Sequence, residues 1–212
     1  MSLKSKEDVV QEFRVQSIQD AAMRVIARKG MSAATMQEIA EEAGVAKGTI
    51  YLYFRDRDEL VEKTFETAIT QLIARVDKAR DAQPDLESKI RAIIKAKFEF
   101  FRENREFFRL YMSLRLPEGD AQQQRRHKRT CEPQYRGSVE RFARLLGEAM
   151  DRNEIRRFDP QRLALFIVEG SNAIVVERVM EETSPPEEDD VEFLTEVIMG
   201  GIRPQSPSRS RV

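Results

Sequence analysis

Cysteine, tryptophan, glycine and proline are scarce in this sequence: among 212 residues there are one cysteine, no tryptophan, nine glycines and eight prolines. The single cysteine, Cys131, excludes an internal disulfide framework and any zinc module built from several cysteines. No stretch approaches the roughly eighteen apolar residues that a membrane helix needs, and the N-terminal segment lacks an apolar core of signal-peptide length. We therefore expect a cytoplasmic protein with no membrane segment.

The residues that are abundant favour helices. Ala, Leu, Ile, Glu, Arg and Lys recur, and charged residues make up 34% of the chain, a balance typical of long exposed helices. The formal net charge is only -1, and cationic and anionic side chains nearly balance in the first sixty residues as well. A uniformly basic surface therefore cannot be the basis of nucleic-acid binding. We expect an all-α protein in which any affinity for DNA depends on individual side chains.

Three helices are predicted near the N-terminus. Over residues 13–29 the apolar side chains recur at helical spacing, which predicts an amphipathic helix. Thr35 begins a capping-box pattern, which predicts a second helix over residues 36–43. Gly44 is expected to end this helix, and a third is expected over residues 46–54 after a short turn. The second and third helices have the spacing of a helix-turn-helix.

A helix-turn-helix reads DNA because its second helix enters the major groove while the first crosses the backbone. Two short helices joined at a glycine also occur as a purely structural hairpin, so spacing alone leaves both interpretations open. Five apolar residues have the spacing of the inner faces of a three-helix head, and we predict that they form its core: Ile39, Ala40, Val45, Ile50 and Phe54.

The residues of this segment resemble the TetR family of bacterial transcriptional regulators. The resemblance is carried by the unbroken stretch TMQEIAEEAGVAKGTIYLYFRDRDEL from Thr35 to Leu60. Ala46 stands where the family commonly has Ser, Arg57 where it commonly has Lys, and beyond about Val76 only the helical layout is similar. The resemblance implies a homodimeric regulator of transcription that binds double-stranded operator DNA and is not an enzyme. By default it implies a repressor, and the aromatic residues of the larger domain lead us to expect that a small hydrophobic effector releases it from DNA.

Carried over position by position, the resemblance places eight residues at the DNA: Thr35, Gln37, Lys47, Gly48, Thr49, Tyr51, Tyr53 and Arg57. The amide and amine side chains of this set reach base edges, the glycine permits close approach, and the hydroxyls suit phosphate oxygens. Thr35 and Arg57 are expected to anchor the DNA backbone. The rings of Tyr51 and Tyr53 also suit the core of the head, an alternative that stays open.

The remaining chain predicts a larger helical domain. We expect an arm and helix-turn-helix over residues 1–56, a connecting helix and linker over 57–83, a ligand-binding and dimerisation domain over 84–203, and a disordered tail over 204–212. Within the larger domain, helices are predicted over residues 86–102, 105–114, 139–150, 160–182 and 189–199. Pro133 either starts the third of these helices or lies as a kink within a longer one.

Two sets of residues in the larger domain are predicted to bind partners. An aromatic concentration predicts a pocket for a small hydrophobic effector, lined by Phe98, Phe101, Phe108, Tyr111, Met112, His127, Phe142 and Asn172. A stripe of apolar and small residues marks the dimer interface that the resemblance implies: Leu163, Ile167, Gly170, Ser171, Ile174, Val175, Val191, Leu194, Val197 and Ile198. A larger domain that serves only as a scaffold and senses no ligand remains an alternative.

An enzyme is the rival class. His127 and Cys131 would share a helix face, but two ligands are too few for a typical zinc site, and spacing identifies no third partner. The basic run over residues 125–129 suits a solvated helix surface, with an anionic ligand or DNA as the alternative. The chain also lacks a phosphate-binding glycine loop. We expect no catalytic residue, no metal and no cofactor.

Overall fold

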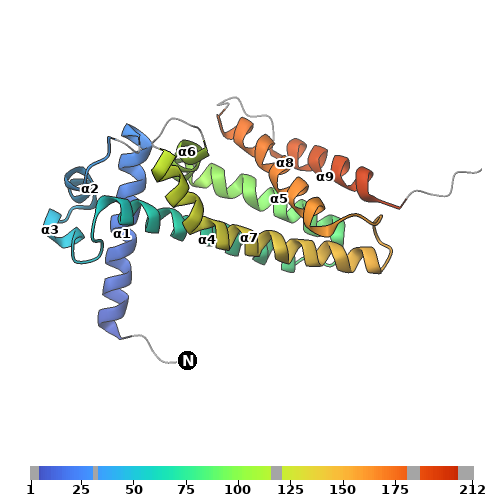
Figure 1. The fold of residues 1–212 in the computed structure, drawn as a ribbon, viewed down its shortest axis with the longest axis horizontal. Helices are drawn as coiled ribbons and strands as arrows, with labels where there is room; N and C mark the ends of the chain where they lie inside the picture. The colour runs from blue at the N-terminus through green and yellow to red at the C-terminus, as the bar shows by residue number, and fades with distance from the viewer. Residues whose placement is uncertain (1–4, 31–32, 116–120, 181–186, 205–212) are drawn as a thin grey trace, which may run out of the picture. The chain divides into compact units, whose positions relative to one another are not determined.

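The computed structural model describes residues 5–30, 33–115, 121–180 and 187–204, and the regular structure in these ranges is entirely helical. The prediction of an all-α protein is confirmed. None of the helices in this part has the length and apolar character that crossing a bilayer requires. The helices, labelled in Figure 1, are α1 Lys6–Lys29, α2 Met36–Ala43, α3 Lys47–Ile50, α4 Arg57–Asp81, α5 Leu86–Glu103, α6 Arg105–Arg115, α7 Ala121–Asp151, α8 Pro160–Met180 and α9 Glu187–Ile202.

The chain forms two compact units. The first runs to Thr70 and includes residues 104–132, and the second consists of residues 71–103 together with the chain from Pro133 onward. The division passes through α4 and α7, and it groups α6 with the N-terminal helices. Pro133 lies within α7, so of the two predicted alternatives the longer helix is the one observed. Because proline has no backbone N–H to donate, it weakens the helical ladder at this junction.

The core of the first unit joins the helix-turn-helix to α6. Ile39 and Ile50 are fully buried, and α1 contacts both α2 and α6. The ring of Phe65 on α4 lies 5.5 Å from the ring of Phe107 and 6.4 Å from the ring of Tyr111, both on α6. The predicted core residues Ile39, Ala40, Ile50 and Phe54 are confirmed as buried, whereas Val45 is only half-buried.

Helix α1 begins seven residues earlier than the sequence predicted. Ser5 caps it, because its side chain accepts from the backbone N–H of Asp8 and the Asp8 carboxylate accepts from the N–H of Ser5 at 3.0 Å. This is a capping box with Asp in place of the usual Glu or Gln. The N-terminal half of α1 is exposed and extends past α2 and α3 (Figure 1).

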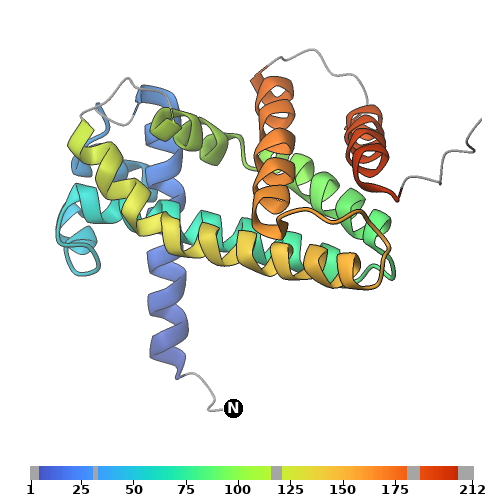
Figure 2. The ribbon, with the colours of Figure 1, turned by 45° about the vertical axis from the view of Figure 1, so that its right-hand side comes forward.

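The second unit is built around α5, which contacts both α8 and α9 (Figure 2). Ion pairs fix the end of α4 to this unit. Arg75 donates to Glu99 at 3.0 Å and to Glu103 at 2.5 Å, and Asp77 accepts from Arg141 of α7 at 2.8 Å. The end of the connecting helix is therefore held against both α5 and α7.

Candidate DNA-binding site

The start and end of α2 follow the predicted signals. The backbone N–H of Glu38 donates to the hydroxyl of Thr35 at 3.3 Å, and the carboxylate of Glu38 accepts from the N–H of Thr35 at 3.1 Å. Gly44 ends the helix with φ of 66°, a left-handed conformation that glycine adopts without strain. The capping box and the glycine turn of the helix-turn-helix are confirmed.

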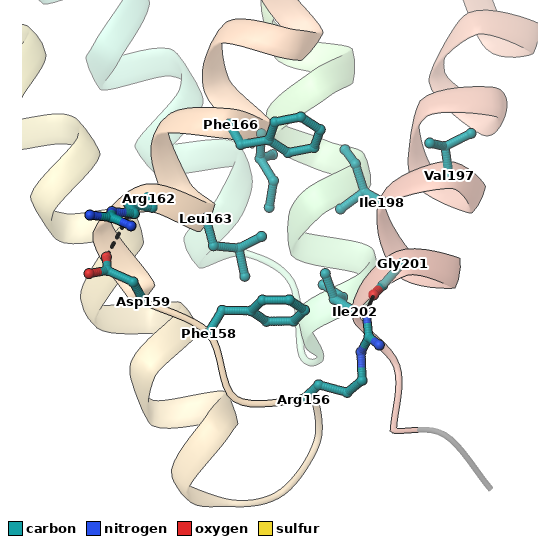
Figure 3. A pocket seen from close by; sticks show the side chains of 11 residues that line it. Arg156, Phe158, Asp159, Arg162, Leu163, Phe166, Val197, Ile198, Gly201 and Ile202 are labelled. Atoms are coloured by element: carbon teal, nitrogen blue, oxygen red, sulfur yellow. Dashed lines mark hydrogen bonds between the residues drawn. The ribbon is translucent and has the colours of Figure 1, made fainter.

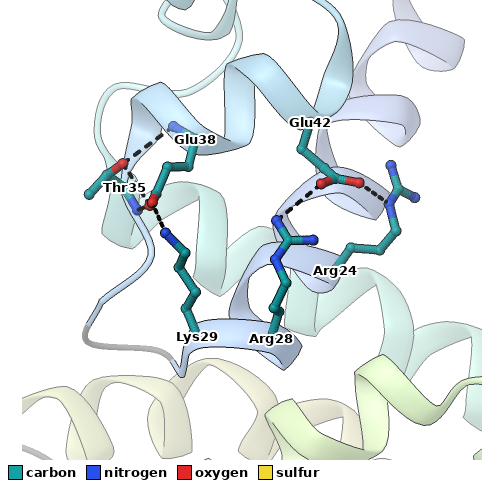
Figure 4. Close-up of polar contacts among 6 residues, drawn as sticks. All are labelled: Arg24, Arg28, Lys29, Thr35, Glu38 and Glu42. Carbon is teal, nitrogen blue, oxygen red and sulfur yellow. Dashed lines mark hydrogen bonds and ion pairs between the residues drawn. The ribbon is translucent and has the colours of Figure 1, made fainter.

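Two carboxylates of α2 tie it to α1 (Figure 4). Glu38 accepts from Lys29, while Glu42 accepts from Arg24 at 2.8 Å and from Arg28 at 3.2 Å. The hydrogen bond from Lys29, supported by Thr35, holds the pKa of Glu38 below its ordinary value. Hydrogen bonds from the two arginines lower the pKa of Glu42 in the same way. Both carboxylates therefore keep their charge to a lower pH than an isolated glutamate does.

This pairing was not predicted from the sequence, although part of the pattern that produces it is visible there. Arg24 and Arg28 are four residues apart on one helix and therefore project from the same face. Their shared partner, Glu42, lies on a different helix, and only the folded head brings the three charges together.

Helix α3 presents one face to the core and one to solvent. Ile50 and Phe54 are buried, whereas Lys47, Gly48 and Tyr51 are exposed. The helix has no side-chain cap at Ala46, but the turn continues past Ile50 through hydrogen bonds from the N–H groups of residues 52–54. The outward residues of α3 are therefore accessible to solvent.

The two tyrosines predicted to contact DNA differ in their surroundings. Tyr51 is 48% exposed, whereas Tyr53 and the nearby Thr49 are half-buried. Gln37 is exposed on the first turn of α2 and donates to Glu41 at 2.8 Å. Seven of the eight predicted contacts thus lie at α2 or on the α3 segment, residues 47–54, within one unit. Tyr51 has the most accessible ring among them.

Arg57 makes an intramolecular contact that was not predicted from the sequence. Its Nε donates to the backbone carbonyl of Ala34 at 2.7 Å, and one terminal nitrogen lies 3.5 Å from Asp58. The other terminal nitrogen, Nη2, is buried with no hydrogen-bond partner in the described part of the chain. The guanidinium thus holds the segment before α2 against the start of α4, which gives Arg57 a structural contact in addition to the predicted one with phosphate.

The residues predicted to line an effector pocket belong to different units. Phe98, Phe101, Phe142 and Asn172 are buried in the second unit, whereas Phe108 and Tyr111 belong to the first. Within the first unit, the aromatic side of α6 packs onto α4, where Phe65 contacts Phe107 and Tyr111. The side chains of Met112 and His127 lie outside the described residues, as do the side chain of Cys131 and the tail beyond Pro204.

Asn172 is part of a buried polar cluster that was not predicted from the sequence. Lys97 on α5 is only 6% exposed, and its amine donates to the carbonyl of Val168 at 3.2 Å, to Ser171 Oγ at 2.9 Å and to Asn172 Oδ1 at 3.1 Å. The sequence feature that could have indicated this cluster is a lysine at a core position of an amphipathic helix, between Ala96 and Phe98. This cluster joins α5 to α8.

The predicted dimer stripe needs a correction. Seven of its ten residues are buried within the protomer itself: Leu163, Ile167, Ser171, Val175, Val191, Leu194 and Ile198. Gly170 and Val197 are exposed, and Ile174 is half-buried. Helix α8 is apolar around much of its circumference, so the stripe read from the sequence is mainly the side that packs on α5. Among the side chains that the structure describes, the large apolar ones left exposed on α8 and α9 are Leu165, Phe166, Phe193 and Val197.

A groove of about 440 Å³ lies between the start of α8 and the end of α9 (Figure 3). Phe158 and Phe166 line it together with Val197, and all three are exposed. Arg156 bonds to the carbonyl of Gly201 and lies 5.1 Å from the ring centre of Phe158. Phe166 of α8 and Val197 of α9 both line the groove, so exposed apolar side chains of the two helices share this surface.

Comparison with known proteins supports the site. Residues 18–64 match the family described as bacterial regulatory proteins, tetR family. A Bacillus subtilis protein described as the uncharacterized HTH-type transcriptional regulator YfiR is 28% identical over 163 residues, covering 76% of this chain and 78% of YfiR. The fatty acid metabolism regulator protein of the same bacterium is 34% identical over 79 residues, which cover 37% of this chain and 41% of that protein.

Two solved structures share the fold over almost their whole length. The transcriptional regulator FadR of Bacillus subtilis, in complex with stearoyl-CoA, has a TM-score of 0.77 and 23% identity, covering 89% of this chain and 99% of that chain. The fatty acid degradation regulator FadR from Bacillus halodurans has a TM-score of 0.77 and 20% identity, covering 94% and 98%. At these identities the likeness concerns the fold.

Proposed function

The chain belongs to the TetR family of bacterial regulatory proteins, and we propose that it binds an operator in double-stranded DNA through α3 and the first turn of α2. The observation that carries this proposal is the division of the α3 segment into a buried face and an exposed one. Ile50 and Phe54 fix the segment to the head, while Lys47, Gly48 and Tyr51 remain accessible. A helix held in this way can enter the major groove without disturbing the core.

Lys47 is the proposed electrostatic contact of this surface. It is exposed, and among the residues that the structure describes none forms an ion pair with it. The basic side chains of Arg24, Arg28 and Lys29, by contrast, are paired with carboxylates of α2. Since the net charge of the chain is only -1, we expect DNA affinity to depend on a few such local cations.

We propose that the regulator acts as a homodimer through the exposed apolar surface of α8 and α9. Phe166 is 70% exposed, Val197 lines the same groove, and Leu165 and Phe193 are also exposed on these two helices. Burial of this surface against a second copy removes apolar area from water. Two recognition helices related by a two-fold axis then contact two half-sites, so the dimer recognises a longer DNA sequence than one helix does.

We propose that a small hydrophobic effector binds in the second unit and releases a repressor from its operator. The buried aromatic side chains of α5 and α7, Phe98, Phe101 and Phe142, support this site, as does the description of FadR in complex with stearoyl-CoA. The chain passes from α5 directly into α6, which packs on α1 and α4 of the head. A shift of α5 would therefore reach the DNA-binding helices through α6.

The first test selects bound sequences from a random library of DNA duplexes. We expect the protein to act on an operator in the chromosome, in the cytoplasm. We expect a two-fold symmetric consensus, bound far more tightly than unrelated DNA, and a loss of affinity for Lys47→Ala.

A second test titrates acyl-CoA thioesters and free fatty acids into the protein–DNA complex, and fluorescence anisotropy measures the DNA that remains bound. Failure to select any consensus would contradict operator binding. Ligands that stabilise the protein but leave DNA affinity unchanged would contradict the release mechanism and favour the scaffold.

A further inference from the structure

The most exposed large apolar side chain in the described part of the chain lies on the α3 segment. Leu52 is 78% exposed, and it follows Tyr51 at the end of α3. An exposed leucine is not unusual by itself. This one, however, lies on the element that the proposed function brings closest to the bases, and its burial there would remove apolar surface from water.

The direction of Leu52 follows from the helical turn that contains it. Its N–H donates to the carbonyl of Thr49 at 3.2 Å, and the N–H of Phe54 donates to the carbonyl of Ile50 at 3.0 Å. Ile50 and Phe54 are buried. Because each residue advances about 100° around a helix, Leu52 lies nearly opposite both of them. Leu52 therefore projects from the outermost line of the segment.

Gly48 lies one turn earlier on the same outward line. A Cβ built at this position would meet no atom within 4 Å, and the backbone does not have a positive φ. Neither packing nor backbone conformation in the free protein therefore requires glycine here. Because Gly48 has no side chain, the helix surface beside Leu52 can come closer to the base edges of a DNA groove.

We propose that Leu52 is a specificity-determining residue that packs against the C5-methyl group of a thymine in the major groove, with Gly48 allowing the approach. The inference rests on the proposed function. The thymine methyl is the apolar feature of the major-groove base edges, whereas the other groups there are hydrogen-bond donors and acceptors. An isobutyl side chain can distinguish thymine by this methyl group and offers no hydrogen bond to the other bases.

The test uses the selected operator, in which each thymine is replaced in turn by deoxyuridine. This change removes one methyl group and leaves base pairing intact. For the wild-type protein we expect one position in each half-site at which the replacement weakens binding about fourfold, the factor that corresponds to one buried methylene-sized group. Leu52→Ala should bind the unmodified operator more weakly and show no further loss at that position. Leu52→Met, which keeps an apolar side chain, should retain most of the effect.

The outcomes are distinguishable. An operator that is bound specifically, with the same deoxyuridine effect in wild type and Leu52→Ala at every position, would overturn the Leu52 contact while leaving operator binding intact. Absence of any selected operator would overturn the proposed function and this inference with it. Circular dichroism and thermal denaturation of Leu52→Ala should match the wild type, and unfolding of that variant would show instead that Leu52 packs within the head.

Discussion

The Nε of Arg57 donates a hydrogen bond to the backbone carbonyl of Ala34, 23 residues earlier in the chain, at 2.7 Å. Ala34 precedes the capping residue of α2, and Arg57 is the first residue of α4. The contact thus joins the two ends of the helix-turn-helix. A residue expected to hold DNA phosphate also fixes the segment that positions α2.

Arg57→Ala is predicted to destabilise the head and to weaken binding to all DNA sequences. The loss of a hydrogen bond to a charged donor costs about 1.5–3 kcal/mol. Arg57→Lys should recover only part of the stability, because lysine lacks the planar guanidinium. Thermal denaturation measures the first effect, and DNA titrations across ionic strength separate the two roles. A salt slope that falls by about one unit indicates a phosphate contact, whereas an unchanged slope indicates that Arg57 acts through Ala34.

Gly48→Ala is predicted to change stability and DNA binding in opposite directions. Alanine is favoured over glycine in a helix by about 1 kcal/mol, and the added Cβ has open space around it. The melting temperature should rise slightly, while affinity for the operator falls because the methyl group keeps the helix away from the groove. Denaturation and anisotropy measure the two effects. Unchanged affinity would contradict close approach at Gly48.

Glu42→Gln is predicted to make the stability of the head less sensitive to acid. Since Arg24 and Arg28 lower the pKa of Glu42 in the folded protein, its stabilising effect is complete above the ordinary glutamate pKa of about 4.3. The effect is lost as the pH falls through the lowered value. The difference in melting temperature between wild type and variant should therefore be greatest at neutral pH and shrink toward acid. Glu7→Gln on the exposed start of α1 is the control, and a difference independent of pH would contradict the linkage.

Phe166→Glu is predicted to convert the homodimer to a monomer. The side chain is 70% exposed on α8, and a carboxylate buried against a second copy would lose its hydration without a partner. Phe13→Glu is a matched control, because Phe13 is 75% exposed on α1 and outside the apolar surface of α8 and α9. Analytical ultracentrifugation at micromolar concentration measures the result. A dimer that survives Phe166→Glu would contradict the proposed interface.

Lys97→Met is predicted to destabilise the second unit by about 1–3 kcal/mol, because it leaves Ser171 and Asn172 buried without the amine that they accept from. Lys95→Met is the control two residues away. Lys95 is exposed, and its amine is 3.9 Å from Glu188, so its replacement should change stability by no more than about 0.5 kcal/mol. Urea denaturation compares the two variants. Equal effects would contradict a structural role for the buried cluster.

The sequence by itself determined the local features of this protein. The bounds of α2 were predicted residue by residue because their signals, Thr35 with Glu38 and then Gly44, act within a few positions along the chain. The inward spacing of Ile50 and Phe54 likewise follows from helical periodicity, and it leaves the opposite face of α3 exposed to solvent.

The tertiary structure alone decided what each face meets. Arg57 bonds to Ala34, Glu42 gathers Arg24 and Arg28, and α6 packs with the head, all through contacts between residues distant in sequence. Helix α8 gives the clearest reason: when apolar residues surround much of a helix, periodicity cannot say which side packs on its own protomer. Packing on α5 buried Ile167 and Val175 and left Leu165 and Phe166 exposed to solvent.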